Sequence, residues 1–486
     1  MQQVIPEVTR AVRYDRQSRI AGWNQEKLEK TRIGIIGCGS LAQFTALPLA
    51  ALGFGHVEIY DISRVDARNR NDFLCSWARK GTYKTAALEE ILTQINPHSG
   101  TKGINMQFRH PSQALLMNSL DLIIDCTNDS FSKLIALEYG KAAGIPVITA
   151  ASSPEMGELA LSKGRFDEGL LFPEYSAKSQ SVITSMVIGG LIADEARKLV
   201  MPLNDKPLEK IIAYNRRSTE RTGYANNVET NPGAGMPGSH VVLVGAGALG
   251  NFVGLGLAIQ GIERLTVFDD DVVEETNLNR QVLFYDAVGR YKAEALVEKL
   301  ARINSKIDYV HRKSRVGKGF GKFLRDEKPD LMIDSVDNFK TRALLNYFAR
   351  ATGIPLISGG TDFKSGQTTV YVPGKTSCLQ CQLTIDDLAL QSLRPQSCIY
   401  AAEPSVIISN QVVGGMITGE AYTVLAPQDN GEPIRGVLKY SSTEPERIGM
   451  LGSRDACKCH EQKKEEHKEW WNKMGKLYIK KGEQDG

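Results

Sequence analysis

Residues 241–250 read V-V-L-V-G-A-G-A-L-G, an apolar run that passes directly into Gly245, Gly247 and Gly250. The pattern predicts a buried strand that turns sharply into a helix. Backbone N–H groups at the start of such a helix face an anion, and glycine lets the main chain approach it closely. Dinucleotide dehydrogenases and many methyltransferases use the same turn, so on its own it indicates only a phosphate-binding fold.

The residues after the glycine turn narrow the class of phosphate-binding protein. The apolar segment Leu265–Phe268 ends in three aspartates, and N-L-N-R-Q at 277–281 and Lys292 follow. Asp269 falls about where a dinucleotide fold places its ribose-binding carboxylate. A nicotinamide enzyme has no use for the cations of Arg280 and Lys292 beside that carboxylate. Two cations next to a phosphate-binding turn indicate a triphosphate.

This combination of glycine turn, D-x-D, N-L-x-R-Q and lysine resembles the ThiF/MoeB/HesA family, which adenylylates ubiquitin and its relatives. The resemblance covers both halves of the chain and implies that Arg280 and Lys292 act on ATP phosphates as catalytic cations. The aspartates would hold ribose and Mg²⁺. The full set of ATP-binding residues implied by the resemblance is Gly245, Gly247, Gly250, Asp269, Asp271, Asn277, Arg280, Gln281, Lys292, Asp337 and Asn338.

Composition sets outer limits on the protein. The 486 residues suffice for two or three domains, and a net charge of +3 is too small to argue for nucleic acid. The first ten residues lack the pattern of a signal peptide, and no apolar run reaches the length of a membrane span. We therefore expect a soluble, cytoplasmic protein with no membrane partner. Its eight cysteines are then thiols, metal ligands or nucleophiles before they are disulfides.

The chain contains the same pattern twice. Gly37 stands 208 residues before Gly245, and the same offset joins Asp61 to Asp269 and Lys84 to Lys292. Strand-like runs alternate with helical segments such as 86–95 and 293–303. The fold expected is α/β, with two tandem Rossmann-like, doubly wound parallel-sheet adenylation domains. We place an inactive domain at 1–225, a linker rich in Asn, Gly and Pro at 226–238, and the active domain at 239–486.

The two copies differ in their chemistry. Where the second copy has Arg280-Gln281 the first has Asp72-Phe73, and Ser63 stands in the place of Asp271. Asn128 likewise replaces the later aspartate of the second copy. These losses leave little to bind Mg·ATP, so we interpret the first copy as an inactive partner. Two working sites are the alternative.

The N-terminal segment R-Y-D-R-Q at 13–17 is expected to be helical and, without a function, would be a solvated face. In relatives, the second arginine of this R-Y-x-R-Q pattern crosses to the neighbouring site as an arginine finger. The second copy has no such segment of its own. By resemblance, Arg16 of the first copy is therefore a catalytic residue of the second.

Asp337 follows the expected strand 331–333, at the sheet edge where open parallel sheets place ligand groups. An aspartate here could merely cap the next helix. The resemblance instead makes Asp337 the Mg²⁺ ligand of an adenylation reaction. In that reaction a carboxylate oxygen attacks the α-phosphorus of ATP, pyrophosphate leaves and an acyl-adenylate forms.

Two cysteine pairs have the character of a zinc site, which in the family is structural. They are Cys378, Cys381, Cys457 and Cys459. Four thiolates suit a tetrahedral Zn²⁺ ion, but the second pair is separated by only one residue, which leaves His460 as a substitute ligand. Ordinary thiols are the alternative. A short charged helix is expected from His460 to Lys481.

Cys398 stands apart from both pairs, in an expected loop before the helix 404–425. In relatives that pass their cargo on as a thioester or persulfide, the reactive cysteine occupies this loop, so Cys398 is a candidate catalytic residue. Arg394 could favour its thiolate. An ordinary exposed cysteine is the alternative.

The implied function is ATP-dependent activation of a ubiquitin-like protein at its C-terminal glycine carboxylate. A thioester on Cys398 and transfer to a conjugating enzyme would follow, with ATP, Mg²⁺ and Zn²⁺ as cofactors. Adenylylation and sulfur transfer to a sulfur-carrier protein of the molybdopterin or thiamin type is the alternative, and a non-catalytic scaffold is a third. The fused copies most resemble activating enzymes of bacterial ubiquitin-like conjugation operons, some of which serve antiviral defence. The chain would be a pseudo-dimeric monomer or part of a higher assembly.

Overall fold

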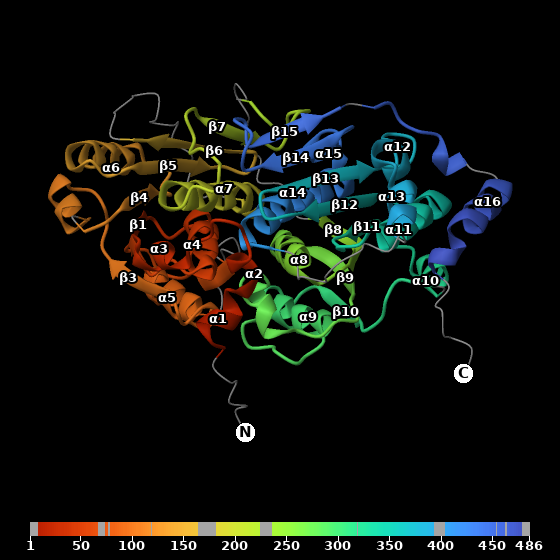
Figure 1. The fold of residues 1–486 in the computed structure, drawn as a ribbon, viewed down its shortest axis with the longest axis horizontal. Helices are drawn as coiled ribbons and strands as arrows, with labels where there is room; N and C mark the ends of the chain where they lie inside the picture. Colours follow the sequence, from red (N-terminus) through yellow and green to blue (C-terminus); the bar gives the residue numbers. More distant parts are fainter. Residues whose placement is uncertain are drawn as a thin grey trace.

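Each half of the chain builds its own sheet in the computed structural model (Figure 1). The structure describes residues 8–66, 73–75, 78–117, 119–163, 181–223, 236–317, 319–392, 404–452, 454–461 and 464–478. Within these residues the first sheet has the order β3-β2-β1-β4-β5-β6-β7, and the second has the order β10-β9-β8-β11-β12-β13-β14-β15. The glycine turns follow β1 and β8, which are central strands of their sheets.

The first half runs from an N-terminal pair of short helices to a long buried helix, α7. Strands β1 to β5 pair in parallel, and β6 and β7 add an antiparallel end. Its elements are α1 (Arg10–Arg13), α2 (Asp15–Ser18), α3 (Gln25–Lys30), β1 (Arg32–Ile36), α4 (Ser40–Leu52), β2 (His56–Asp61), α5 (Lys84–Ile95), β3 (Gly100–Asn105), β4 (Leu122–Asp125), α6 (Ser130–Ala143), β5 (Val147–Ser152), β6 (Met156–Ser162), α7 (Val182–Val200) and β7 (Ile212–Asn215).

The second half repeats this order and adds a further edge strand, β15, and a C-terminal helix. Strands β8 to β12 pair in parallel, and β13 to β15 are antiparallel. Its elements are β8 (Met236–Val244), α8 (Ala248–Gln260), β9 (Ile262–Phe268), α9 (Lys292–Ile303), β10 (Asp308–Arg312), α10 (Phe320–Glu327), β11 (Leu331–Asp334), α11 (Phe339–Thr352), β12 (Leu356–Thr361), β13 (Ser365–Tyr371), α12 (Leu379–Leu383), α13 (Ile385–Gln391), α14 (Ile407–Leu425), α15 (Pro427–Asn430), β14 (Val437–Ser441), β15 (Ile448–Leu451) and α16 (Lys464–Met474).

The prediction of two doubly wound α/β units is confirmed, with one refinement. The parallel part of each sheet continues into antiparallel strands, because β5–β6 and β12–β13 are joined by short connections that return the chain directly. Strand β8 begins at Met236, inside the stretch expected to be linker, because it already pairs with β9 there. Residues 226–235 of that stretch lie outside the described residues.

The C-terminal helix is shorter than the sequence predicts. It spans Lys464–Met474 rather than His460–Lys481, because Cys459–Glu461 forms a separate short turn beside the cysteine cluster and Gly475 follows the helix. Trp470 anchors the helix by donating to Asp386 at 3.0 Å and stacking on Tyr347.

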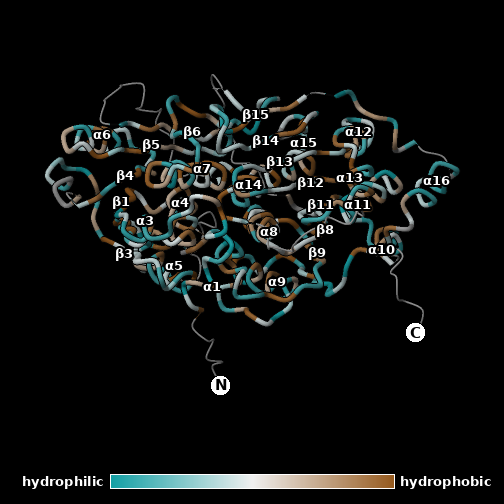
Figure 2. Tube along the Cα trace, in the orientation of Figure 1, coloured by the Kyte–Doolittle hydropathy of each residue, from teal (hydrophilic) through white to brown (hydrophobic). Residues whose placement is uncertain are grey.

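The two halves are joined through their long helices (Figure 1). Helix α7 of the first half packs against α14 of the second, and a glycine pair in each helix makes the crossing close. A Cβ atom at Gly190 would lie 2.6 Å from Val412, and one at Gly415 would lie 2.7 Å from Val187. Figure 2 shows that α7 and α8, at the centre of the molecule, are largely hydrophobic, whereas α16 at the edge is hydrophilic.

A buried arginine–glutamate pair crosses between the halves on each side of this helix crossing. Arg447 of the second half donates to Glu195 of α7 at 2.8 Å, and Arg221 of the first half donates to Glu420 of α14 at 2.6 Å. All four side chains are at most 5 % exposed. Both arginines have a φ of 58°, so the two corners share one backbone conformation. The halves therefore associate by pseudo-twofold symmetry.

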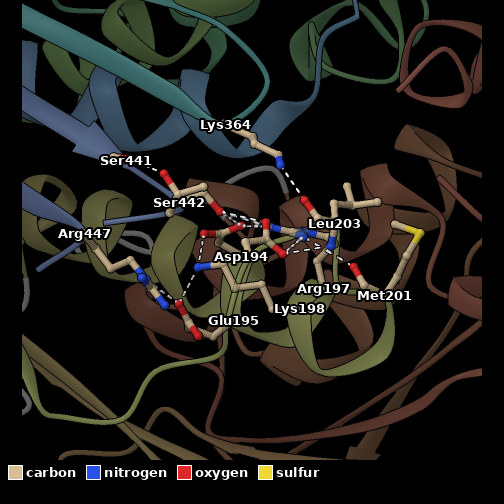
Figure 3. Close-up of polar contacts among 12 residues, drawn as sticks. Asp194, Glu195, Arg197, Lys198, Met201, Leu203, Lys364, Ser441, Ser442 and Arg447 are labelled. Carbon is tan, nitrogen blue, oxygen red and sulfur yellow. Dashed lines mark hydrogen bonds and ion pairs between the residues drawn. The ribbon is translucent and has the colours of Figure 1, made fainter. Parts of the chain in front are cut away.

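Further charges surround the Arg447–Glu195 pair (Figure 3). Arg197 donates to Asp194 at 2.7 Å and to Asp205 at 2.7 Å, and it also donates to Ser442 of the other half at 3.1 Å. The neighbouring Lys198 pairs with Asp194 at 2.8 Å. This network ties α7 to the corner after β14.

Candidate functional site

The glycine turn of the second half lies between β8 and α8, at the carboxyl end of the parallel strands. Gly245 has a φ of 98°, and a Cβ atom at Gly250 would lie 2.1 Å from the Gly245 carbonyl oxygen. Ser335, which follows β11, donates its hydroxyl to that same carbonyl at 2.7 Å. The turn is therefore held tightly against the start of α8, as anion binding by backbone N–H groups requires.

Asp269 is fixed at the end of β9 by two backbone donors. Its carboxylate accepts from the Ala246 N–H at 2.7 Å and from the Asp271 N–H at 2.8 Å. Burial raises the pKa of Asp269, and the two N–H donors oppose that rise. The aspartate thus connects the glycine turn to the loop that follows β9, where a ribose hydroxyl could reach it.

Lys292 begins helix α9 and turns back onto the same loop. Its ammonium group pairs with Asp271 at 2.9 Å, and its backbone N–H donates to the Asp271 carbonyl, also at 2.9 Å. The lysine side chain is 11 % exposed and the aspartate 57 %. The cation also acts on Asp269, since the charge of Lys292 opposes the rise in the pKa of that carboxylate.

Arg280, Asn277 and Gln281 come from the segment between β9 and α9. Asn277 closes a short turn by accepting from the Glu274 N–H at 3.1 Å. Gln281 lies 4.0 Å from the position of a Cβ at Gly247, and its Oε1 atom is buried without a partner among the described residues. An unpaired buried amide oxygen costs free energy unless a ligand or water satisfies it. Gln281 therefore faces the glycine turn with spare hydrogen-bonding capacity.

Arg16 reaches this segment from the first half. Its charge lowers the pKa of Arg280, which burial and Arg16 together bring to about 10. The Nε atom of Arg16 is buried and has no partner within the described parts of the chain. Helix α2, which carries it, contacts the second half, since Gln17 accepts from Asn279 Nδ2 at 3.3 Å. Arg13 of the neighbouring α1 donates to the Leu278 carbonyl at 3.2 Å. Arg13 and Gln17 are buried, so the segment is not a solvated face.

Asp337 and Asn338 lie beyond the end of β11. Asn338 caps α11, because its Oδ1 accepts from the Thr341 N–H at 2.8 Å. Asp337 is exposed, and the contact found for its carboxylate among the described residues is a long one, 3.4 Å from the Asn338 amide. Asp334 is the buried strand-end aspartate and pairs with Arg342 at 3.0 Å. Asn338 thus caps the helix and Asp334 makes the buried ion pair, so the Asp337 carboxylate is left available for a ligand.

The same positions in the first half have lost this character. Asp61 keeps its bond from the Cys38 N–H, at 2.8 Å. Asn128, in the place of Asp337, instead bonds the backbone of Ser152 through its donor at 2.9 Å and its acceptor at 3.3 Å. Phe73, in the place of Gln281, is buried and stacks on Phe44 with ring centroids 4.5 Å apart. The first half therefore keeps the backbone contact to its strand-end aspartate. The other two positions hold side chains that pack or bond within the protein. Asp72 lies outside the described residues.

The four cysteines meet beside α11, where the Leu379 N–H donates to Asn346 of that helix at 3.0 Å. Their sulfur atoms all lie within 4.8 Å of one another, with Cys381 and Cys459 in contact at 3.6 Å. The one-residue spacing of the second pair is accommodated because Cys459 opens the short turn 459–461. Four convergent thiols fit a tetrahedral Zn²⁺ ion without a histidine. The side chain of His460 lies outside the described residues.

Cys398 and Arg394 also lie outside the described residues. The structure describes α13, which ends at Gln391, and α14, which begins at Ile407. Helix 404–425 of the sequence prediction is thus observed from Ile407. The position of the cysteine remains a prediction from the sequence.

Sequence reasoning did not identify several residues around the site. Arg315, after β10, pairs with Asp270 at 2.8 Å and borders an open cleft that Phe268 and Phe323 also line. Asn251 of α8 accepts from the Leu283 N–H at 3.1 Å and so holds the segment after Arg280. No local sequence pattern reveals these two contacts, because the partners in each are far apart in sequence.

A protein-family model described as the ThiF family matches residues 14–232 and 236–465. The chain belongs to the ThiF family. The match covers both halves, as the internal repeat requires. It confirms the family resemblance and, with the observed sheets, the prediction of two tandem domains of this class.

Relatives of two kinds match the chain. The SAMP-activating enzyme E1 of Haloferax volcanii is 40 % identical over 204 residues, which are 42 % of this chain and 72 % of that protein. The sulfur carrier protein ThiS adenylyltransferase of Bacillus subtilis is 36 % identical over 149 residues, 30 % of this chain and 44 % of that protein. The chain thus spans less than half the length of the Bacillus enzyme.

Among solved structures, E. coli MccB with MccA-N7isoASN matches with a TM-score of 0.39 at 24 % identity, over 45 % of this chain and 66 % of that one. The family is one of ATP-using adenylation enzymes, and this chain is a member. In the parts of the chain that the structure describes, no helix is both long and apolar enough to cross a membrane.

Proposed function

We propose that the second half adenylylates the C-terminal glycine carboxylate of a ubiquitin-like protein, using ATP and Mg²⁺. The observation that carries the proposal is the approach of Arg16, from the first half, to Arg280 beside the glycine turn. Two neighbouring guanidinium groups repel each other, the Glu274 carboxylate offsets part of this effect on Arg280, and a polyphosphate would relieve the rest. The interpretation of the first half as an inactive partner follows, since it contributes a cation and lacks the ligand groups.

Each side chain has a role in the proposed reaction. The glycine turn would bind phosphate oxygens through backbone N–H groups, and Asp269 would hold the ribose. Arg16, Arg280 and Lys292 would stabilise the charge that develops as a carboxylate oxygen bonds to the α-phosphorus and the bond to pyrophosphate breaks. Asn277, Gln281 and Asn338 would orient the nucleotide.

The residues present fit Mg²⁺, which binds carboxylate and phosphate oxygens. Asp271 is already paired with Lys292, so the available Asp337 carboxylate is the ligand we assign. A bound Mg²⁺ would neutralise charge on the phosphate oxygens during the reaction. The cysteine cluster fits Zn²⁺ and would be structural, because it would join α12, which contains Cys381 and follows Cys378, to the turn 459–461, which contains Cys459 and follows Cys457.

The main step can be tested by ATP–pyrophosphate exchange, with ubiquitin-fold proteins that end in glycine, taken from the same genome, as carriers. Asp337→Ala should abolish exchange, while Asn128→Ala, the same position in the first half, should leave most of it. Lys292→Ala and Lys84→Ala form a second matched pair with the same expectation. Comparable losses within either pair would contradict a single working site.

Adenylylation followed by sulfur transfer to a sulfur-carrier protein is the second candidate, favoured by the match to a ThiS adenylyltransferase. The two functions diverge at Cys398. If it forms a thioester with the activated carrier, the adduct survives non-reducing gels and is cleaved by hydroxylamine, and Cys398→Ser traps a reductant-resistant ester. A thiocarboxylate on the carrier would instead support sulfur transfer.

If Cys398 forms the thioester, we extend the proposal to a second step, in which the activated carrier passes to a conjugating enzyme in the cytoplasm. The fusion of an inactive copy with an active one supports this extension, because that arrangement is typical of enzymes dedicated to ubiquitin-like conjugation. From the resemblance of the fused copies, we extend the proposal to bacterial ubiquitin-like conjugation operons that serve antiviral defence. A ubiquitin-fold protein and a conjugating enzyme encoded beside this gene would support that role, and a sulfur-transfer operon would count against it.

A further inference from the structure

Asn279 occupies the variable position of the N-L-x-R-Q segment and makes three directed hydrogen bonds. Its Oδ1 accepts from Arg280 Nη1 at 2.8 Å. Its Nδ2 donates to Gln17 Oε1 at 3.3 Å and to the Ser405 carbonyl at 3.2 Å. The side chain is completely buried. One amide therefore connects the active-site arginine, the first half and the start of the segment that enters α14.

The orientation of the Asn279 amide is determined by its surroundings. The Gln17 Nε2 donates to the Leu52 carbonyl at 3.0 Å and to Gln25 Oε1 at 2.8 Å. Gln17 must therefore present its oxygen to Asn279, because a carbonyl can only accept. The Ser405 carbonyl imposes the same choice on Asn279 from the other side. Both constraints direct Nδ2 of Asn279 away from Arg280. They leave Oδ1 to accept the hydrogen bond from the Arg280 guanidinium.

This bond restricts the guanidinium of Arg280. Nη1 donates to Asn279 Oδ1 and to the Thr276 carbonyl, each at 2.8 Å. No further hydrogen bond of the guanidinium is found within the described ranges. Because a guanidinium is planar, fixing one nitrogen between two acceptors sets the direction of the other two. Those nitrogens remain for a ligand beside the glycine turn.

We propose that Asn279 is a positioning residue that orients Arg280 for adenylylation and couples this arginine to α2 and to the chain leaving the Cys398 loop. The proposal rests on the proposed function and adds a residue to which that function assigns no role. Asn279 touches neither carrier nor nucleotide in this scheme. It acts only through Arg280.

The test is a double-mutant cycle in the exchange assay. Asn279→Leu should lower kcat by about 10-fold or more while changing the KM for ATP less than about 3-fold, since the interaction lost is felt in the transition state. In an Arg280→Ala background, Asn279→Leu should cause no further loss. Asn304→Leu is a matched control, because Asn304 is also a buried amide, donates to the Ala258 carbonyl at 2.9 Å, and lies at the far end of α9.

Asn279→Asp keeps the size of the side chain and serves if the leucine variant does not fold. Whatever its effect on kcat, that effect should disappear in the Arg280→Ala background. The proposal is overturned if a folded Asn279→Leu protein keeps the kcat of the native chain, or if the losses from position 279 and position 280 add. Failure of the native chain to exchange pyrophosphate with any carrier would instead sink the proposed function.

Discussion

Arg16 of helix α2 lies close enough to Arg280 of the opposite half that its charge helps to lower the pKa of Arg280 to about 10. The two residues are 264 positions apart in sequence and belong to different copies of the repeat. Their proximity is the structural reason for regarding the two halves as one site rather than two. It also has consequences for stability.

Removing the Arg16 charge should stabilise the nucleotide-free protein. Arg16→Gln relieves the repulsion and breaks no hydrogen bond found in the described residues, so the free energy of unfolding should rise by about 1 kcal/mol. Arg280 is protonated at pH 7, because even its lowered pKa is about 10. The gain should therefore be constant below that pH and fade as pH rises from about 10 towards 12.5.

Urea unfolding without nucleotide provides the measurement. Arg13→Gln is the control on the neighbouring turn, because Arg13 donates to the Ile95 and Leu278 carbonyls, and its loss should destabilise. A destabilised Arg16→Gln protein would show that Arg16 is held by attractive contacts in the absence of ATP.

How far the sequence predicts this site depends on the range of the interactions. The glycine turn, Asp269 and Lys292 are recognisable because each lies next to a strand or at the start of a helix. The repeat also correctly predicts the two sheets, since matching offsets carry matching elements. Ser335, by contrast, holds the turn from 90 positions away, and no local pattern reveals it.

The replacement of ligand groups in the first half is also only partly visible in sequence. Asn128 for Asp337 is an evident substitution, but its engagement with Ser152 requires the positions of β4 and β5. Likewise the arginine–glutamate pairs that join the halves link residues about 200 or more positions apart. The predicted start of the C-terminal helix at His460 was wrong, because the cysteine cluster and not helix propensity fixes the chain near Cys459.

The buried interface pairs should dominate the stability of the assembled halves. Glu195→Ala and Glu420→Ala each leave a buried arginine without its partner, which should cost about 3 kcal/mol in the free energy of unfolding. Glu446→Ala is the control, because its pair with Lys210 is exposed and should contribute less than about 1 kcal/mol. Equal effects from buried and exposed pairs, measured by denaturant unfolding, would contradict the assignment.

Metal content should depend on the four clustered cysteines. Cys457→Ser should lower bound zinc, measured by elemental analysis of the purified protein, and should lower the melting temperature. Cys126→Ser is the control, because Cys126 is a buried thiol of the first half. One equivalent of zinc retained by Cys457→Ser would show that the cluster is made of ordinary thiols or completed by another ligand.

The central claim is that the first half completes the active site of the second. The most direct measurement is the steady-state rate of ATP–pyrophosphate exchange by Arg16→Ala with a carrier that the native chain activates. We predict that kcat falls about 10²-fold or more while ATP affinity changes little, because the cation meets the transition state. Arg19→Ala, which removes an exposed arginine paired with Asp15 on the same segment, should exchange at the native rate. An unchanged kcat in Arg16→Ala would contradict the claim.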